Sequence, residues 1–358
     1  MTPQPREDVI SRVDVLLADA VERGASDIHL TPARAGTDVR LRIDGMLGPA
    51  MTLPTELGRA AVMRLMVMAK LLTYRLDVPQ EGRAGITLAG GPIELRISVI
   101  PTVHGLRCAV RLPAVGGVPE TLDELGLSPD TLAGLRRFVA SDGGLLIVTG
   151  PAGSGKTTTV YSLLRHFLAN RPELSIVSLE DPVEREVSGV AQVEVSSFGQ
   201  LTYERAVRSI LRQDPQVLAL GEVRDAATAS VAVAAALSGH RLICTMHAGS
   251  AGGAVARLIE MGIEPYQITS ALAAVLNQRL VRRRVGDRYA GRVPIAAWTT
   301  LDAATRRAIL DRADADALDT VVLNAGAATL EADGRRLIGM GVTDAAEVAR
   351  VLGEARPG

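Results

Sequence analysis

The chain has 358 residues, which predicts two domains with sizeable cores. Its 39 basic and 40 acidic side chains leave a formal net charge of −1, and only 3% of its residues are aromatic, so it lacks the basic footprint and the stacking platforms typical of a nucleic-acid-binding protein. It also lacks an apolar run long enough to span a bilayer and a recognisable signal peptide, so we expect a cytoplasmic protein.

The first part of the chain, residues 1–113, mixes helical and strand-like patterns. Apolar residues at helical spacing predict a helix over 8–22, and period-two alternation predicts strands over 26–30 and 39–43. Helical spacing returns over 56–72. We therefore expect a small α+β domain.

Two further strands are predicted over 93–99 and 106–112, each with one apolar face and one polar face. Arg96 lies on the polar face of the first strand and Arg111 on that of the second. A charged strand face is most often solvated and protects a sheet from aggregation, so the two arginines do not by themselves indicate a binding site. A linker with glycine and proline over 114–122 is predicted to follow this domain.

A phosphate loop is predicted over 150–159, because this stretch contains the spacing G-x-x-x-x-G-K-[ST] between an apolar strand over 145–149 and a helix over 158–168. Glycine dihedrals let successive N–H groups converge on phosphate oxygens, and the start of the helix adds its dipole. Lys156 is expected to reach the β- and γ-phosphates, and the Thr157 hydroxyl is expected to bind Mg²⁺. The predicted nucleotide-binding residues are Gly150, Pro151, Ala152, Gly153, Ser154, Gly155, Lys156, Thr157 and Thr158.

Strands and helices alternate after the loop, which predicts a parallel sheet covered by helices on both faces. Three predicted strands, over 175–179, 216–221 and 241–245, are each followed by polar side chains. In chain order these are an acidic cluster, a glutamate and a histidine: Glu180, Asp181, Glu184, Glu222 and His247. Because ligands of open α/β sheets bind beyond the carboxyl ends of the strands, we expect these side chains to gather round the nucleotide.

Cysteine and lysine are both rare in this chain. The two cysteines, Cys108 and Cys244, lie in separate strand-like runs, and we expect them to be reduced core residues, not metal ligands or a disulfide. Lysine occurs only at Lys70 and Lys156, and the second of these positions is in the phosphate loop.

Four segments resemble, in order and spacing, the motifs of the secretion ATPase superfamily, the ring motors of type II secretion and type IV pili. They are the phosphate loop, SLEDPVE, RQDPQVLALGEVRD and CTMHAGSA. The resemblance extends over about residues 9–350, through ASDIHL and LRISVIPTVHGLRCAVRLP upstream and LNQRLVRR downstream. It implies an α/β fold with a RecA-like P-loop NTPase domain over 123–298, a smaller N-terminal α+β domain of PAS-like type over 1–113, and a C-terminal helical tail over 299–358.

The resemblance also implies roles for single residues. It makes Glu184 the catalytic glutamate that activates the attacking water, and Glu222 a residue that acts through Mg²⁺ and its waters. It makes His247 a sensor of the γ-phosphate. Arg96 and Arg111 would reach from the first domain to the nucleotide and stabilise the transferring phosphoryl group when the two domains close.

The implied function is a hexameric ring ATPase that uses Mg²⁺ and ATP to power assembly of a type II secretion pseudopilus or a related type IV pilus. Such a protein would associate peripherally with the inner membrane through a platform protein. We expect no zinc, because residues 283–288 lack the cysteines of the four-cysteine element that assembly members usually carry.

Three alternatives stay open. One is a pilus retraction or DNA-uptake motor with the same chemistry, and another is a nucleotide-switched assembly component with little hydrolysis. The third is a nucleic-acid translocase, although we expect no specific nucleic-acid partner. Its only sequence support is an arginine cluster, which is more often a solvated face: Arg279, Arg282, Arg283 and Arg284.

Overall fold

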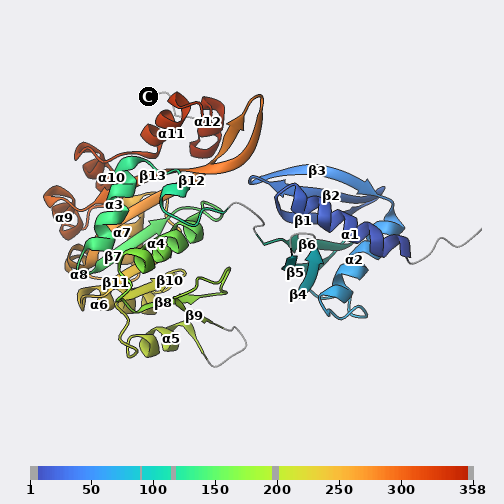
Figure 1. Ribbon diagram of the computed structural model, residues 1–358, viewed down its shortest axis with the longest axis horizontal. Helices are drawn as coiled ribbons and strands as arrows, with labels where there is room; N and C mark the ends of the chain where they lie inside the picture. The colour runs from blue at the N-terminus through green and yellow to red at the C-terminus, as the bar shows by residue number, and fades with distance from the viewer. Residues whose placement is uncertain (1–6, 89–90, 114–117, 196–200, 354–358) are drawn as a thin grey trace, which may run out of the picture. The chain divides into compact units, whose positions relative to one another are not determined.

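The structure is a computed structural model that describes residues 7–88, 91–113, 118–195 and 201–353 (Figure 1). The chain divides into two compact units, Met1–Val118 and Pro119–Gly358, and each unit is described by itself. Within the described ranges, no helix has both the length and the apolar character needed to cross a membrane.

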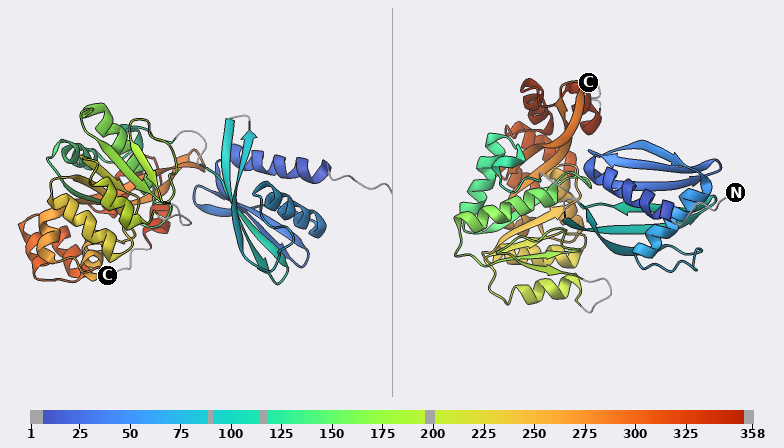
Figure 2. Two further views of the ribbon diagram at one scale, coloured as in Figure 1. Left: turned by 90° about the horizontal axis from the view of Figure 1, so that it is seen from below. Right: turned by 45° about the vertical axis from the view of Figure 1, so that its right-hand side comes forward.

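The first unit is a six-stranded antiparallel sheet with two helices on one side, as Figure 2 shows. The strand order is β3-β2-β1-β6-β5-β4. The elements are α1 Glu7–Glu22, β1 Ala25–Ala33, β2 Gly36–Ile43, β3 Met46–Leu53, α2 Thr55–Met68, β4 Gln80–Leu88, β5 Gly91–Thr102 and β6 Gly105–Arg111. Their core joins the apolar stripes of the two helices to one face of the sheet, and it includes Cys108, which is fully buried and reduced.

The two edge strands, β3 and β4, are elements that the sequence patterns missed. Almost none of their side chains is buried, and both strands contain glycine, so neither shows the apolar alternation by which strands are recognised. The predicted helix over 56–72 was too long, because α2 ends at Met68 and Lys70 adopts a left-handed conformation with φ 56°. The Lys70 and Leu71 N–H groups then close the helix end on the carbonyls of Val67 and Met66.

The second unit is a seven-stranded sheet in the order β13-β12-β7-β11-β10-β8-β9. All neighbouring strands are parallel except β12 and β13, which form an antiparallel hairpin. The strands are β7 Gly144–Thr149, β8 Ile176–Glu180, β9 Ala191–Glu194, β10 Val217–Leu220, β11 Arg241–Met246, β12 Leu272–Val285 and β13 Arg288–Thr300.

Helices cover both faces of this sheet, and two buried clusters fill the layers between (Figures 1 and 2). One cluster lies under α3 Pro129–Ala140 and α4 Lys156–Asn170. The other lies under α5 Tyr203–Ile210, α6 Ala226–Leu237, α7 Ala251–Glu260 and α8 Pro265–Ala271, and it contains Cys244, buried and reduced. The remaining helical segments are η1 Asp123–Leu125, α9 Ala303–Leu310, α10 Ala315–Asn324, α11 Leu330–Gly339 and α12 Ala345–Leu352.

Strand β7 is central because its apolar run is buried on both faces. Its side chains from Leu145 to Val148 are at most 1% exposed, and alternate residues belong to the two different clusters. Such continuous apolar runs are typical of parallel strands covered by helices on both sides. Because β7, β8, β10 and β11 are parallel and in register, their carboxyl ends meet at one edge of the sheet.

A buried ionic cluster holds the C-terminal helices to the β12–β13 hairpin. The Glu347 side chain in α12 is fully buried, and it accepts hydrogen bonds from the Arg282 guanidinium at 2.7 and 3.0 Å and from Arg350 at 2.6 and 2.7 Å. The Tyr289 ring stacks against Arg282, 4.0 Å from ring centroid to Cζ. Burial alone would raise the pKa of Glu347, but hydrogen bonds from Arg350 and Arg282 lower it to about 2.

We expect Glu347→Gln to lower the free energy of unfolding at pH 7 by about 3 kcal/mol, because it leaves two arginines without their buried partner. The low pKa of the folded carboxylate means that Glu347 contributes this stability above its ordinary pKa and loses it as the pH falls toward 2. Urea unfolding of both proteins between pH 7 and pH 2.5 should therefore show the difference shrinking below about pH 4.5. Glu260→Gln, at an exposed position, is the control; a difference that stays constant with pH would contradict this account.

Candidate active site

The loop over 150–155 connects β7 to α4, and two of its glycines are required by both backbone and space. Gly150 has φ 149° and Gly155 has φ 88°. A Cβ on Gly150 would lie 2.3 Å from the main-chain carbonyl oxygen of Gln278. A Cβ on Gly155 would lie 2.7 Å from Nε2 of the Gln278 side chain. A side chain at position 150 would collide with the β12 backbone, and one at position 155 would displace the Gln278 side chain, while the positive φ of both residues favours glycine.

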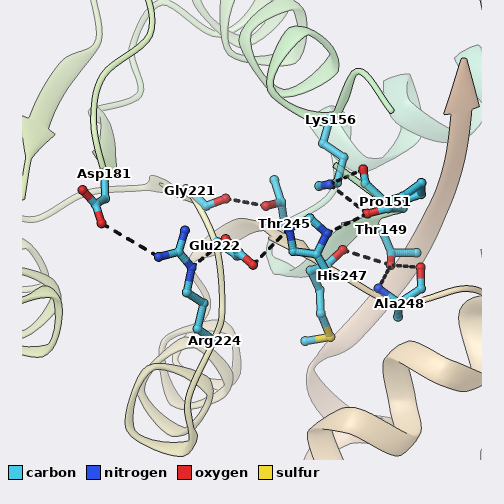
Figure 3. A network of polar contacts seen from close by, with 12 residues as sticks. Thr149, Pro151, Lys156, Asp181, Gly221, Glu222, Arg224, Thr245, His247 and Ala248 are labelled. Atoms are coloured by element: carbon cyan, nitrogen blue, oxygen red, sulfur yellow. Dashed lines mark hydrogen bonds and ion pairs between the residues drawn. The ribbon is translucent and has the colours of Figure 1, made fainter. Parts of the chain in front are cut away.

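Lys156, the first residue of α4, folds over the mouth of this loop (Figure 3). Its ammonium donates to the carbonyls of Gly150 at 2.8 Å and Pro151 at 2.9 Å. An ammonium has three N–H donors, so one stays available for a ligand. Burial lowers the pKa of Lys156, nearby Glu222 opposes that change, and Arg279 adds to it. Among the described residues no carboxylate lies within 4.0 Å of this ammonium, so its charge is only partly compensated before a negatively charged ligand binds.

His247 joins the loop to the end of the neighbouring strands (Figure 3). It follows β11, and its Nδ1 lies 3.2 Å from the Gly150 carbonyl oxygen while its Nε2 lies 3.3 Å from Glu222 Oε1. Glu222 follows β10, and its Oε2 accepts a hydrogen bond of 2.7 Å from Arg224 Nε. The structure thus brings together Lys156, Glu222 and His247, three residues that the sequence placed in different segments.

Two threonine hydroxyls, which the sequence patterns did not single out, tie the strand ends together (Figure 3). The Thr149 hydroxyl accepts from the Ala248 N–H at 3.0 Å and lies within hydrogen-bond distance of the Met246 carbonyl. The Thr245 hydroxyl donates to the Gly221 carbonyl. These side-chain bonds continue the ladder beyond the last paired residues, so the His247 loop is fixed against the phosphate loop.

The predicted acidic cluster after β8 separates into residues with different surroundings. Glu180 is 6% exposed and accepts hydrogen bonds from Tyr161, from Ser178 at 2.7 Å and from Gln192 at 3.0 Å. Asp181 is exposed and lies 3.9 Å from Arg224, at the limit of an ion pair. Glu180 is therefore a structural carboxylate, and satisfied hydrogen bonds explain its burial.

Glu184 is exposed, and in the described part of the chain its carboxylate has no hydrogen bond or ion pair. Its position is set through the main chain, because the Glu184 N–H donates to the Tyr161 hydroxyl at 3.2 Å. That hydroxyl also donates to Glu180, and burial together with Glu180 raises the pKa of Tyr161. Tyr161 thus anchors the segment that carries Glu184. It lies among apolar residues of α4, so nothing in the sequence indicated this role.

Similarity to known proteins agrees with this geometry. A model of the type II/IV secretion system protein family matches residues 4–350. The chain belongs to this family. Type II secretion system protein HxcR of Pseudomonas aeruginosa is 38% identical over 97% of this chain and 78% of its own length. Type II secretion system ATPase E of Vibrio cholerae is 39% identical over 78% of this chain and 55% of its own length.

The fold of this chain also matches that of a solved structure. The crystal structure of the pilus retraction motor PilT with bound ADP matches with a TM-score of 0.69 and 26% identity, over 97% of each chain. Membership of the type II/IV secretion family confirms the predicted resemblance, and the likeness to PilT confirms the predicted α/β fold with a RecA-like domain and a smaller α+β domain.

The residues beside the loop fit a magnesium ion that binds together with a nucleotide. Thr157 is half-buried in the first turn of α4, next to Lys156, and Glu222 lies across the loop mouth. In the ranges that the structure describes, no group of three or more His, Cys, Asp and Glu side chains could hold a metal alone. Mg²⁺ does not need such a group, since it commonly takes one or two protein oxygens and completes its shell with water and phosphate.

The two predicted arginines of this secretion-family chain lie together in the first unit. Arg96 in β5 and Arg111 in β6 are direct cross-strand partners. Arg83 in β4 lies opposite Arg96, and Asp27 in β1 lies opposite Arg111, 3.4 Å from Arg111 Nε to Asp27 Oδ1. The strands thus align a row of guanidinium groups, in agreement with the arginine-bearing face that the sequence predicted for β5 and β6. Their action on a nucleotide stays a prediction.

We expect Tyr161→Phe to lower ATP turnover roughly tenfold, because the segment carrying Glu184 loses its anchor. The affinity for ATP should stay unchanged, since Tyr161 is not in the phosphate loop. The free energy of unfolding should fall by about 1–3 kcal/mol, because buried Glu180 loses one donor. Steady-state turnover, a binding titration and urea unfolding measure the three quantities.

Tyr289→Phe serves as the control, because it also removes a hydroxyl that donates to a carboxylate, that of Asp344. Equal turnover in the Tyr161→Phe and Tyr289→Phe variants would refute the positioning role of Tyr161.

Proposed function

We propose that this chain is an ATPase that hydrolyses ATP to power a type II secretion system, by assembling its pseudopilus or a related type IV pilus. One observation supports this most strongly. The Gly150 carbonyl is contacted by both Lys156 and His247, and His247 also contacts Glu222. Three polar side chains thus converge on a phosphate loop in a member of the type II/IV secretion family.

In this proposal the loop binds the triphosphate before any chemistry takes place. Its N–H groups and the start of α4 face the phosphates, and the remaining Lys156 N–H donates to an oxygen between the β- and γ-phosphates. Thr157 and Glu222 would hold Mg²⁺, Glu222 partly through water. The bound ion would neutralise charge that develops on the transferring phosphoryl group.

Glu184 and His247 then have different tasks at the transferring group. The Glu184 carboxylate, exposed and without a hydrogen bond or ion pair among the described residues, would accept a proton from the attacking water or orient it. His247 already has both ring nitrogens next to acceptors, the Gly150 carbonyl and Glu222. A γ-phosphate offers a further acceptor, so its arrival and departure would move the His247 ring and signal the state of the nucleotide.

The working form in this proposal is a homo-hexamer on the cytoplasmic side of the inner membrane, bound to a platform protein there. Arg96 and Arg111 would complete the nucleotide site when units close on one another, and closure would convert hydrolysis into motion. The type II secretion relatives at 38–39% identity favour assembly. The likeness to the retraction motor PilT, at 26% identity, keeps retraction or DNA uptake as the second candidate.

We expect purified wild-type protein to hydrolyse Mg-ATP, and Glu184→Gln to bind ATP with unchanged affinity while turnover falls by about a hundredfold or more. Phosphate release measures turnover, and light scattering with and without ATP measures the mass of the assembly. Glu186→Gln, an exposed neighbour on the same segment, is the matched control. Wild-type protein that binds ATP tightly without turnover would instead indicate a nucleotide-switched assembly component.

We expect Arg96→Ala to bind ATP normally and to hydrolyse it about a hundredfold more slowly, because the arginine would stabilise charge only in the transition state. Arg59→Ala, at an exposed position of α2, should behave as wild type.

Mixing the Arg96→Ala and Glu184→Gln proteins tests whether the arginine acts between chains. If it does, mixed rings contain some interfaces with both residues intact, and turnover should rise above that of either variant alone. Absence of rescue in confirmed mixed assemblies would place the arginine in its own chain's site, and normal turnover of Arg96→Ala would remove it from the mechanism.

A further inference from the structure

The arginine cluster noted in the sequence does not form one basic surface. Arg282 lies in the buried ionic cluster with Glu347, and Arg284 contacts the Gly286 carbonyl in the hairpin turn. Arg283 is exposed. Only Arg279 lies next to the phosphate loop, so the four residues serve different purposes and need separate explanations.

Arg279 is a half-buried cation whose partners are all neutral oxygens. Its Nη1 donates to Asn277 Oδ1 at 2.8 Å and to the Gln278 carbonyl at 3.0 Å, and its Nη2 donates to the Gly249 carbonyl at 3.1 Å. Burial lowers the pKa of Arg279. Across the described ranges no carboxylate lies within 4.0 Å of it. A partly buried charge normally has an opposite charge beside it, because loss of hydration is otherwise costly.

The place of Arg279 in the sheet explains why such a charge is useful there. Strand β12 pairs with β7 so that Asn277 lies opposite Thr149, the last residue of β7. Arg279 therefore continues along the side of the phosphate loop, and a Cβ on Gly150 would lie 3.2 Å from its Nη1. Its charge is close enough to act on Lys156 across the loop. Phosphates bound in the loop would be the missing negative charge.

Arg279 also holds the loop that carries His247. The Gly249 carbonyl, two residues after His247, accepts from Arg279 Nη2 and from Asn277 Nδ2 at 2.6 Å. On the opposite face of β12, buried Gln278 donates to the Ser154 carbonyl at 2.8 Å and accepts from the Thr159 hydroxyl at 2.9 Å. Three consecutive residues of β12 thus hold both the phosphate loop and the His247 loop.

We infer that Arg279 is a positioning residue of the nucleotide site, which fixes the His247 loop beside the phosphate loop and compensates the charge of the bound triphosphate from within the same chain. The inference rests on the proposed ATPase function. It adds to the nucleotide site a cation supplied by β12, the strand next to β7. Because the guanidinium has no acidic partner among the residues that the structure describes, its contribution to binding should grow with the number of phosphates on the nucleotide.

The test uses the full chain with Arg279→Gln, Arg279→Lys and the control Arg283→Gln, an exposed position on the same strand. Binding of ATP and ADP, kcat and KM, and the melting temperature with and without nucleotide are measured for each. We expect Arg279→Gln to weaken ATP binding roughly tenfold and ADP binding less, because the effect scales with ligand charge. Arg279→Lys should keep most of the affinity but show a lower kcat, because an ammonium lacks the planar fork that reaches Gly249 and Asn277 together.

A purely structural role predicts a different pattern. The nucleotide-free melting temperature of Arg279→Gln would fall, ATP and ADP binding would weaken by the same factor, and Arg279→Lys would fail to restore the difference between them; that result would overturn the inference. Unchanged ATP affinity and kcat in Arg279→Gln would overturn it as well. Failure of the proposed function is recognised separately, since wild-type protein would then show no turnover while the binding of ATP and ADP can still be compared.

Discussion

One backbone carbonyl, that of Gly150, organises the site. It lies where β7 ends, and both Lys156 and His247 contact it. The arrangement depends on the parallel register of β7 with β11, in which Thr149 lies opposite Met246. The next residues, Gly150 and His247, therefore lie side by side. It also depends on glycine at position 150, because a side chain there would collide with β12. Strand β7 therefore places the residues of the site as well as forming the centre of the sheet.

Two arginines of β12 that lie three residues apart, Arg279 and Arg282, have different ionic surroundings. Arg282 is matched by buried Glu347 and by the face of Tyr289, so that point contributes to stability. Arg279 and nearby Lys156 have no carboxylate contact among the described residues, so the nucleotide-free protein keeps two incompletely compensated cations beside the phosphate loop. Such local imbalance is typical of binding sites, where stability is given up for affinity toward a ligand of opposite charge.

Local patterns were enough to predict the phosphate loop and the elements on either side of it. The apolar run of β7, the glycine spacing and the uninterrupted helix after Lys156 lie within about 25 consecutive residues and need no distant partner to be recognised. The edge strands β3 and β4 escaped prediction for the opposite reason. Each pairs through its backbone with one neighbouring strand while its side chains stay largely outside the core, so composition carried no signal.

The sequence by itself therefore predicted the α/β fold and the phosphate loop, because these follow from short-range periodicity and motif spacing, and its resemblance to the secretion ATPase motifs predicted the family. Only the tertiary structure decided which polar residues share a site. It buried Glu180 and left Glu184 exposed, it gave Tyr161 an anchoring role, and it separated Arg279 from Arg282. Contacts such as that between Gln278 and Ser154 join residues far apart in the chain. They depend on which strands become neighbours in the sheet, and no local stretch of sequence encodes that order.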